Sequence, residues 1–308
     1  MGPAPRVVAV VGPTATGKST LGVALARALG GEVVNTDSMQ LYRGMDIGTA
    51  KLTVSERQGV PHHLLDIWPV TDAAAVADYQ RRACRVVDDL LAAGAVPVLV
   101  GGSGLYVRAV IDRIEFPGTD AGLRAALEAE LATVGAAVLH ARLAAVDPAA
   151  AAAILPSNGR RIVRALEVVE LTGRPFTAAL PSYDASDSSG WDVRQIGLDL
   201  PDAELDERVD ARAATMFAAG LLDEVRRLEQ EGLRAGRTAS RAIGYQQALA
   251  VLDGELTEAQ AREETARATR RFVRRQRSWF RRDPRIRWLP PGPDLLDRAV
   301  AAVSASAG

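Results

Sequence analysis

The chain has 308 residues, of which 48% are hydrophobic and 24% charged, and its net charge is −1. This composition is typical of a globular protein and excludes a mostly disordered chain. The single cysteine, Cys84, excludes an intrachain disulfide, and no apolar run approaches the ~18 residues of a membrane span, so we expect a cytoplasmic protein without a membrane partner.

The first hundred residues alternate apolar runs with helical patterns. Continuous apolar runs at 6–11, 32–35 and 96–100 predict strands that are buried on both faces of a parallel sheet. Helical spacing at 19–29 and 76–93, in each case followed by glycine, predicts the intervening helices. This alternation is typical of an α/β fold.

The pattern changes near residue 115, where strand signals disappear. Helical spacing covers 120–145, Asp147-Pro148 interrupts it, and a second helix is expected at 159–171. The stretch 181–190 is polar and predicts a loop. We therefore expect an all-helical insertion over residues 115–190.

The core is expected to resume after the insertion, so that it consists of residues 1–114 and 191–308. A strand at 195–200 and a last strand at 286–289 are predicted by their apolar runs. Helical spacing between these strands predicts four helices, at 203–218, 221–231, 244–252 and 257–282.

Charge is concentrated near the C-terminus. The segment 261–288 carries eleven arginines against three acidic residues, a net charge of +8. Such a segment is either a solvated basic helix or a surface for a polyanion. Phe272, Trp279 and Phe280 interleave with the arginines, and we expect these aromatic rings mostly in the core, with part of the arginine face touching RNA.

The strongest motif lies directly after the first predicted strand and opens the first predicted helix. It matches G-x-x-x-x-G-K-[ST], whose backbone N–H groups and helix N-terminus cradle phosphates. Lys18 is expected to reach the outer phosphate oxygens, and the Ser19 hydroxyl is expected to bind Mg²⁺. The motif predicts a P-loop NTPase-like parallel sheet and comprises Gly12, Pro13, Thr14, Ala15, Thr16, Gly17, Lys18 and Ser19.

A second acid, which P-loop NTPases use to hold Mg²⁺, is missing after the strand at 96–100. The nearest acid at a strand end is Asp37, which should face the same crevice because ligands bind at the carboxyl ends of parallel strands. Its carboxylate has two plausible roles, binding Mg²⁺ through water or accepting a proton from a nucleophile. Asp37 as a simple turn cap is the alternative.

Other polar residues carry weaker signals. Ser103 lies in a glycine-rich turn at a strand end, where it offers a hydroxyl. His62 and His63 have no cysteine nearby, so we expect local hydrogen bonds in a loop and no zinc site. Lysine is rare, with only Lys18 and Lys51 in the whole chain, which suggests that each is needed as a compact point charge.

Two pairs of arginines have helical i, i+4 spacing. Arg160 and Arg164, beside Arg161, are equally consistent with phosphate contact and with a solvated surface. Arg208 and Arg212 offer a guanidinium for a diphosphate, although their acidic surroundings favour solvated ion pairs.

Taken together, seven segments resemble the bacterial tRNA dimethylallyltransferases, occur in that family's order and span nearly the whole chain. The most specific is NTDSMQLYRGMDIGTAK at 35–51. The others are GPTATGKS (12–19), PHHLLD (61–66), GGSGLY (101–106), RRIVRALEV (160–168), RAIGYQQ (241–247) and RRQRSWFRRDPRI (274–286).

The resemblance implies transfer of a dimethylallyl group from dimethylallyl diphosphate to N6 of adenosine 37, beside the anticodon, in tRNAs that read codons beginning with U. Asp37 would form a hydrogen bond with N6 and take its proton. Lys18 and the loop amides would hold the diphosphate, with Mg²⁺ bound to Ser19. Arg208 or Arg212 would help to hold the diphosphate. Ser103 stands where family members commonly have threonine. The resemblance implies tRNA contacts by Asp37, Ser38, Met39, Gln40, Ser103, Arg160, Arg161, Arg164, Arg241, Gly244, Tyr245, Gln246, Arg274 and Arg277.

Two other functions compete with this interpretation. A P-loop kinase of a small metabolite would leave the basic aromatic helix and the 35–51 segment unexplained. An RNA-binding protein whose P-loop senses nucleotide would bind ATP or GTP without any transfer reaction. For the transferase, the expected partners are the tRNA anticodon stem-loop and dimethylallyl diphosphate, and a monomer suffices.

Overall fold

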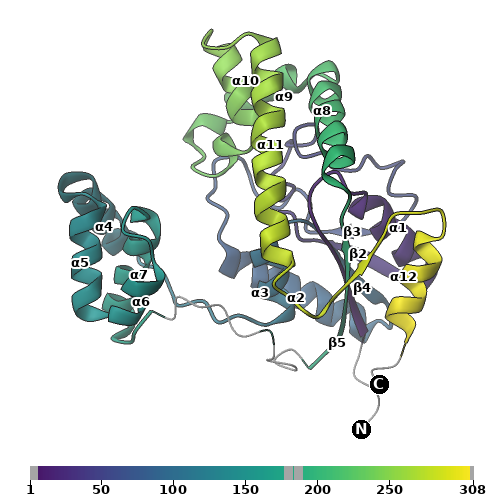
Figure 1. The fold of residues 1–308 in the computed structure, drawn as a ribbon, viewed down its shortest axis with the longest axis horizontal. Coiled ribbons are helices and arrows are strands. Elements are labelled where there is room, and N and C mark those ends of the chain that lie inside the picture. The colour runs from purple at the N-terminus through teal and green to yellow at the C-terminus, as the bar shows by residue number, and fades with distance from the viewer. Residues whose placement is uncertain (1–5, 177–182, 184–189, 306–308) are drawn as a thin grey trace. The chain divides into compact units, whose positions relative to one another are not determined.

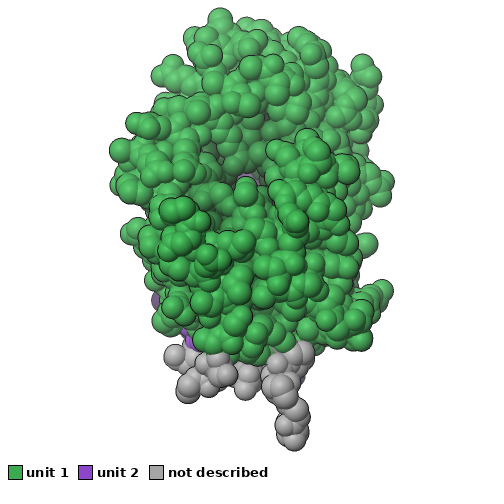
Figure 2. Space-filling view, turned by 90° about the vertical axis from the view of Figure 1, so that its right-hand side faces the viewer, with its two compact units in different colours: residues 1–113, 186–308 green, residues 114–185 purple. Residues whose placement is uncertain are grey.

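The computed structural model describes residues 6–176, 183 and 190–305. These residues form two compact units, residues 1–113 with 186–308, and residues 114–185. Figure 2 shows that the two sequence-distant parts of the first unit join into one continuous body. No helix within the described ranges is both long enough and apolar enough to span a bilayer.

Unit 1 is built on a six-stranded sheet in the order β3-β2-β4-β1-β5-β6, in which every pairing is parallel. The α/β expectation is therefore confirmed, with the central strand β1 between β4 and β5. The strands are β1 (Arg6–Val11), β2 (Gly31–Asn35), β3 (His62–His63), β4 (Val96–Val100), β5 (Asp192–Leu198) and β6 (Ile286–Leu289).

Apolar residues on both faces of the sheet explain its two covering layers (Figure 1). On one face, Val7, Ala9 and Val11 belong to the core that includes α2 (Val76–Ala92) and α3 (Gly104–Ile111). On the other, Val8 and Val10 pack in the core that includes α1 (Lys18–Leu29) and α12 (Leu295–Ser304). Strands with both faces buried read as continuous apolar runs.

The last third of unit 1 is helical. Its helices α8, α9, α10 and α11 lie together beyond one end of the sheet (Figure 1). They span Asp202–Ala218, Leu221–Gln230, Tyr245–Leu252 and Glu258–Phe280, with two short 3-10 turns at Leu233–Ala235 and Ala239–Arg241. In α11, Phe280 is buried in the core and Trp279 packs against it, as expected, whereas Phe272 is partly buried and belongs to no core cluster of the described residues.

The described part of unit 2 contains four helices and has its own apolar core. The helices are α4 (Ala121–Val134), α5 (Ala136–Val146), α6 (Pro148–Ala153) and α7 (Gly159–Thr172). The core residues include Leu127, Leu139, Leu143, Ile162 and Leu166.

Several sequence predictions need correction. The break expected at Asp147-Pro148 is confirmed, because α5 ends at Val146, but the prediction missed that α6 starts there, where Asp147 accepts the Ala150 N–H at 3.0 Å and proline occupies the first helical position. His62 and His63 form strand β3 and not a loop. Helices α3 and α12 were not predicted. The loop expected at 181–190 lies outside the described residues apart from Tyr183 and Gly190.

Candidate active site

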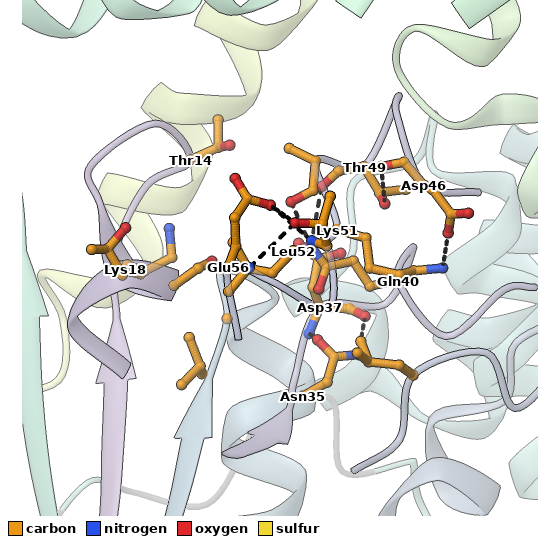
Figure 3. A pocket seen from close by; sticks show the side chains of 18 of the residues that line it. Thr14, Lys18, Asn35, Asp37, Gln40, Asp46, Thr49, Lys51, Leu52 and Glu56 are labelled. Carbon is orange, nitrogen blue, oxygen red and sulfur yellow. Dashed lines mark hydrogen bonds and ion pairs between the residues drawn. The ribbon is translucent and has the colours of Figure 1, made fainter. Parts of the chain in front are cut away.

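A pocket of about 620 Å³ lies where β1, β2 and β4 end. Each of these strands is followed by one of the predicted polar segments, the P-loop, the Asp37 segment and the Gly101-Gly102-Ser103 turn. Figure 3 shows that Thr14 and Lys18 of the P-loop line the same pocket as Asp37 and Gln40. The prediction that these segments meet at one edge of the sheet is therefore confirmed.

The P-loop backbone follows directly from its residue types. Gly12 has a φ of +134°, and a Cβ there would lie 2.2 Å from the Leu198 carbonyl oxygen. Gly17 has a φ of +90° and precedes the first residue of α1. Ala15 adopts a φ of +65°, which is unusual for a residue with a side chain. Thr16 Oγ1 closes the loop by donating to the Pro13 carbonyl at 2.9 Å.

Two cations enter the pocket from different elements, Lys18 from α1 and Arg212 from α8. The Lys18 ammonium donates to the Pro13 carbonyl, and Arg212 donates to Thr14 Oγ1 at 3.2 Å and to the Thr49 carbonyl at 3.4 Å. Within the described residues neither forms an ion pair with an acidic side chain. Two such cations at a helix N-terminus make a site for a multiply charged anion.

Burial perturbs both cations. It lowers the pKa of Lys18 from 10.5 to about 7, with a further lowering by the Arg212 charge that the Asp37 carboxylate partly offsets. Burial also lowers the pKa of Arg212, again opposed by Asp37. Buried groups with perturbed pKa values in a pocket are candidates for a functional site, here one that binds an anion.

Arg208 lies outside this arrangement. Its side chain is 47% exposed and pairs with Glu204 at 2.8 Å within the same helix. Of the two arginines that the sequence left open, Arg212 is therefore the one that the fold brings to the P-loop.

Asp37 is held by its immediate neighbours. Its Oδ1 accepts the Met39 N–H at 2.9 Å, and its own N–H donates to Asn35 Oδ1 at 2.9 Å. Ser103 Oγ accepts the Ser38 N–H at 3.2 Å and lies 3.2 Å from Ser38 Oγ, so the glycine-rich turn fixes the segment that carries the carboxylate. Gln40 Nε2 donates to the Thr49 carbonyl at 3.1 Å.

The other residues predicted to contact tRNA differ in their exposure. Arg160 and Arg161 are exposed on α7, whereas Arg164 pairs with buried Glu167 and donates to the Gly118 carbonyl. Arg241, Gln246 and Arg274 are exposed, and Gly244 is buried.

Tyr245 and Arg277 are engaged inside the protein. Tyr245 is fully buried, and its hydroxyl donates to Glu224 Oε1 at 2.5 Å. Arg277 is 12% exposed, pairs with Asp199 at 2.7 Å and also pairs with Asp202. In this structure both side chains are engaged by other protein groups, and the expected tRNA contacts by Tyr245 and Arg277 stay a prediction.

Sequence reasoning missed the residues that shape the pocket from outside its motifs. Glu224 of α9 accepts three backbone N–H groups, those of Asp46, Ile47 and Gly48, at 2.8–3.4 Å. It thereby holds the loop that carries pocket residues 46–53. Glu224 has no local sequence signal, because its partners lie about 180 residues away.

Lys51, one of the two lysines of the chain, has a structural role. Its side chain is 3% exposed and lies between Asp46 and Asp66, with 2.6 Å to an oxygen of each. A third bond reaches the Tyr42 carbonyl at 3.1 Å. Lys51 therefore joins the 40–51 loop to the segment after β3.

The histidines form local contacts. His62 lies 2.8 Å from the Val60 carbonyl and lines the pocket, and His63 lies 2.5 Å from Glu32 Oε2. No group of three or more His, Cys, Asp or Glu side chains suited to a metal occurs in the described part of the chain.

Comparisons with known proteins agree on one family. The IPP transferase family model matches residues 40–283. A tRNA dimethylallyltransferase of Salinispora arenicola is 68% identical over 302 residues, which cover 98% of this chain and 87% of that protein. The same named protein of Streptomyces coelicolor is 68% identical over 290 residues, covering 94% and 92%.

Solved structures show the same similarity. The tRNA isopentenylpyrophosphate transferase of Bacillus halodurans has a TM-score of 0.70 and 39% identity, covering 97% of this chain and 94% of that one. A eukaryotic dimethylallyltransferase acting on tRNA has a TM-score of 0.79 at 23% identity, covering 97% and 78%, a likeness of fold alone.

Proposed function

Because the chain belongs to the IPP transferase family, we propose that it moves the dimethylallyl group of dimethylallyl diphosphate to N6 of adenosine 37 in tRNA. The activity is that of a tRNA dimethylallyltransferase, a transferase of prenyl groups. The diphosphate donor, the nucleotide position and the restriction to tRNAs that read codons beginning with U form our proposal.

One observation carries the chemistry, the convergence of Lys18, Arg212 and Asp37 on one pocket. An allylic diphosphate loses its diphosphate most easily when positive groups stabilise the charge that develops on it. Lys18, Arg212 and the P-loop amides supply such groups, already in place before the reaction. The carboxylate beside them supplies the proton acceptor that an amine nucleophile needs.

In the step we propose, N6 of adenine attacks C1 of the dimethylallyl group. The C1–O bond breaks, and its electron pair leaves with the diphosphate that Lys18 and Arg212 hold. Asp37 accepts the proton that N6 loses. Ser38, Met39 and Gln40 follow Asp37 in the chain and hold the flipped adenine, which must leave its stack to enter the pocket.

The P-loop also fits a magnesium ion. Mg²⁺ prefers oxygen ligands and usually keeps waters and substrate phosphates in its shell, so few protein ligands are needed. The Ser19 hydroxyl lines the pocket next to Lys18 and is suited to be such a ligand. When bound there, Mg²⁺ would neutralise charge on the leaving diphosphate.

For the tRNA we propose the anticodon stem-loop as the bound part, with phosphate contacts by exposed arginines. Arg160 and Arg161 of unit 2 and Arg274 of α11 are exposed, and we assign such contacts to them. Arginine on helices binds phosphate by charge and shape, as expected for structured RNA. A cytoplasmic monomer suffices for this reaction.

Asp37→Asn tests the proposal at the reacting atom. Asparagine keeps the acceptor oxygen for Met39 N–H but loses the basicity of the carboxylate. We expect the single-turnover rate of transfer to fall by about 10²- to 10⁴-fold while tRNA affinity changes little. A variant that reacts at the normal rate would exclude Asp37 as the base, and one that only loses tRNA would assign it to binding.

A further inference from the structure

Gln276 is a buried glutamine of the basic helix α11, and its carboxamide joins two loops of the pocket. Its Oε1 accepts the Thr14 N–H of the P-loop at 3.0 Å. Its Nε2 donates to the Gly102 carbonyl at 2.9 Å. The residue is 5% exposed and lies 262 positions from Thr14 in the sequence.

The chemistry of the site is specific for an amide. The P-loop offers the Thr14 N–H as a donor, and the other loop offers the Gly102 carbonyl as an acceptor. A carboxamide carries the matching acceptor oxygen and donor nitrogen on one planar group. An apolar side chain of the same length would leave the Thr14 N–H and the Gly102 carbonyl without these partners in a buried place.

Gly102 is shaped to receive this side chain. A Cβ on Gly102 would lie 2.2 Å from Gln276 Nε2 and 3.3 Å from the Gly12 carbonyl oxygen. A side chain at residue 102 would therefore require the Gln276 carboxamide to shift from this position.

A short chain of contacts leads from Gln276 to the carboxylate. Gly102 precedes Ser103, and the Ser103 hydroxyl accepts the Ser38 N–H at 3.2 Å. Ser38 follows Asp37. One side chain thus touches the loop that cradles phosphate and, through Ser103, the segment that carries Asp37.

We propose that Gln276 is a positioning residue that sets the diphosphate cradle relative to Asp37 and couples both to helix α11. This inference rests on the proposed function. The same helix exposes Arg274 and Arg275, the two residues that directly precede Gln276. RNA that binds these arginines therefore contacts the element that holds the cradle.

Gln276→Met tests the proposal, because methionine keeps the side-chain length and removes both hydrogen bonds. We expect the KM for dimethylallyl diphosphate to rise roughly tenfold and the KM for tRNA to change less than twofold. Binding of inorganic diphosphate, measured by calorimetry without tRNA, should weaken by a similar factor. Gln276→Glu, which keeps the acceptor for Thr14 N–H and lacks the Nε2 donor, is the second variant if methionine prevents folding.

Gln195→Met is the matched control. Gln195 is also buried, at 6% exposure, and donates to Asp283 Oδ2 at 3.4 Å outside the pocket. Both variants lose a buried amide, but only the Gln276 variant should change diphosphate binding. Equal changes in the two variants, or an unchanged diphosphate affinity in Gln276→Met, would overturn the proposal.

The two proposals fail separately. If the wild-type chain binds diphosphate and Gln276→Met binds it about tenfold more weakly, the positioning role stands even when no dimethylallyl transfer is found. If transfer is found and Gln276→Met leaves both diphosphate affinity and KM unchanged, only the positioning role is lost.

Discussion

At the scale of single residues, the surroundings of the two lysines explain why arginine does not replace them. Lys51 is 3% exposed and satisfied by two carboxylates and a carbonyl, a compact arrangement around one ammonium. As whole residues Lys18 and Lys51 are equally buried, but among the described residues Lys18 donates to the Pro13 carbonyl and forms no ion pair. Lys51 is therefore a structural tie, whereas Lys18 keeps N–H donors for a ligand.

Lys18 gives the anion site a pH dependence. Because the pKa of Lys18 is about 7 in the ligand-free pocket, the amine is protonated at pH 6 and mostly neutral at pH 9. A bound diphosphate favours the charged form, so binding above pH 7 requires proton uptake. The affinity ratio of wild type to Lys18→Met for inorganic diphosphate should fall by about tenfold per pH unit above 7.

Calorimetry at fixed ionic strength between pH 6 and pH 9 measures this ratio. The Lys18→Met variant corrects for the titration of diphosphate itself, because that titration is common to both proteins. A ratio that stays constant over the range would show that Lys18 does not change protonation state at the site.

Arg212 and Arg208 form a matched pair on α8. Arg212→Gln removes a buried cation at the P-loop, and we expect kcat/KM for dimethylallyl diphosphate to fall by about 10²- to 10³-fold. Arg208→Gln removes an exposed ion pair with Glu204 and should change this value by less than about twofold. Steady-state kinetics at saturating tRNA compares them, and equal losses would contradict the assignment of Arg212.

At the scale of elements, the C-terminal half of α11 and the residue after it carry two kinds of arginine. Arg270 and Arg277 of α11 and Arg281, its C-cap, pair with the acidic residues Asp210 and Asp199. Arg271, Arg274 and Arg275 are exposed, and none of them forms an ion pair with an acid in the described part of the chain. In this half of the helix, these three arginines can therefore exchange solvent for phosphate.

The triple variant Arg271→Gln, Arg274→Gln, Arg275→Gln should therefore weaken tRNA binding and flatten its salt dependence. Each lost phosphate contact lowers the slope of log Kd against log salt by about 0.7–0.9. Filter binding at several salt concentrations measures the slope, with Arg270→Gln as the control that should leave it nearly unchanged. An unaltered slope in the triple variant would place the tRNA elsewhere.

The sequence predicts those elements whose stability is encoded locally. Apolar runs identified β1, β2 and β4, because strands buried on both faces leave an unbroken signal. Strand β3 has two residues and exists only through its pairing with β2, so no local pattern marks it. The break at Asp147-Pro148 was predicted, but the start of α6 was not, because Asp-Pro is found both where a helix ends and where a capped helix starts.

The same distinction applies to the site. The P-loop residues and Asp37 were predicted because a motif or a strand end marks them in the sequence. Glu224 and Gln276 were not, because their partners are backbone groups some 180 and 260 residues away. The choice of Arg212 over Arg208 likewise needed the fold, since both share one helix.

At the scale of the whole molecule, the chain returns to one sheet after a separate unit. Strand β5 follows residues 114–185 and pairs with β1, the first strand of the chain. The helices after β5 then supply Arg212 to the pocket, and Glu224 and Gln276 to the loops that line it. The site is therefore complete only when both parts of unit 1 have folded together.

The most direct measurement of the central claim is transfer to tRNA itself. Purified protein is incubated with unmodified tRNA, Mg²⁺ and dimethylallyl diphosphate, and the digested RNA is examined by mass spectrometry. We predict dimethylallyl-adenosine at position 37, with none formed when ATP replaces the prenyl diphosphate. Consumption of ATP without any prenylated adenosine would contradict the account and favour a P-loop kinase or nucleotide sensor.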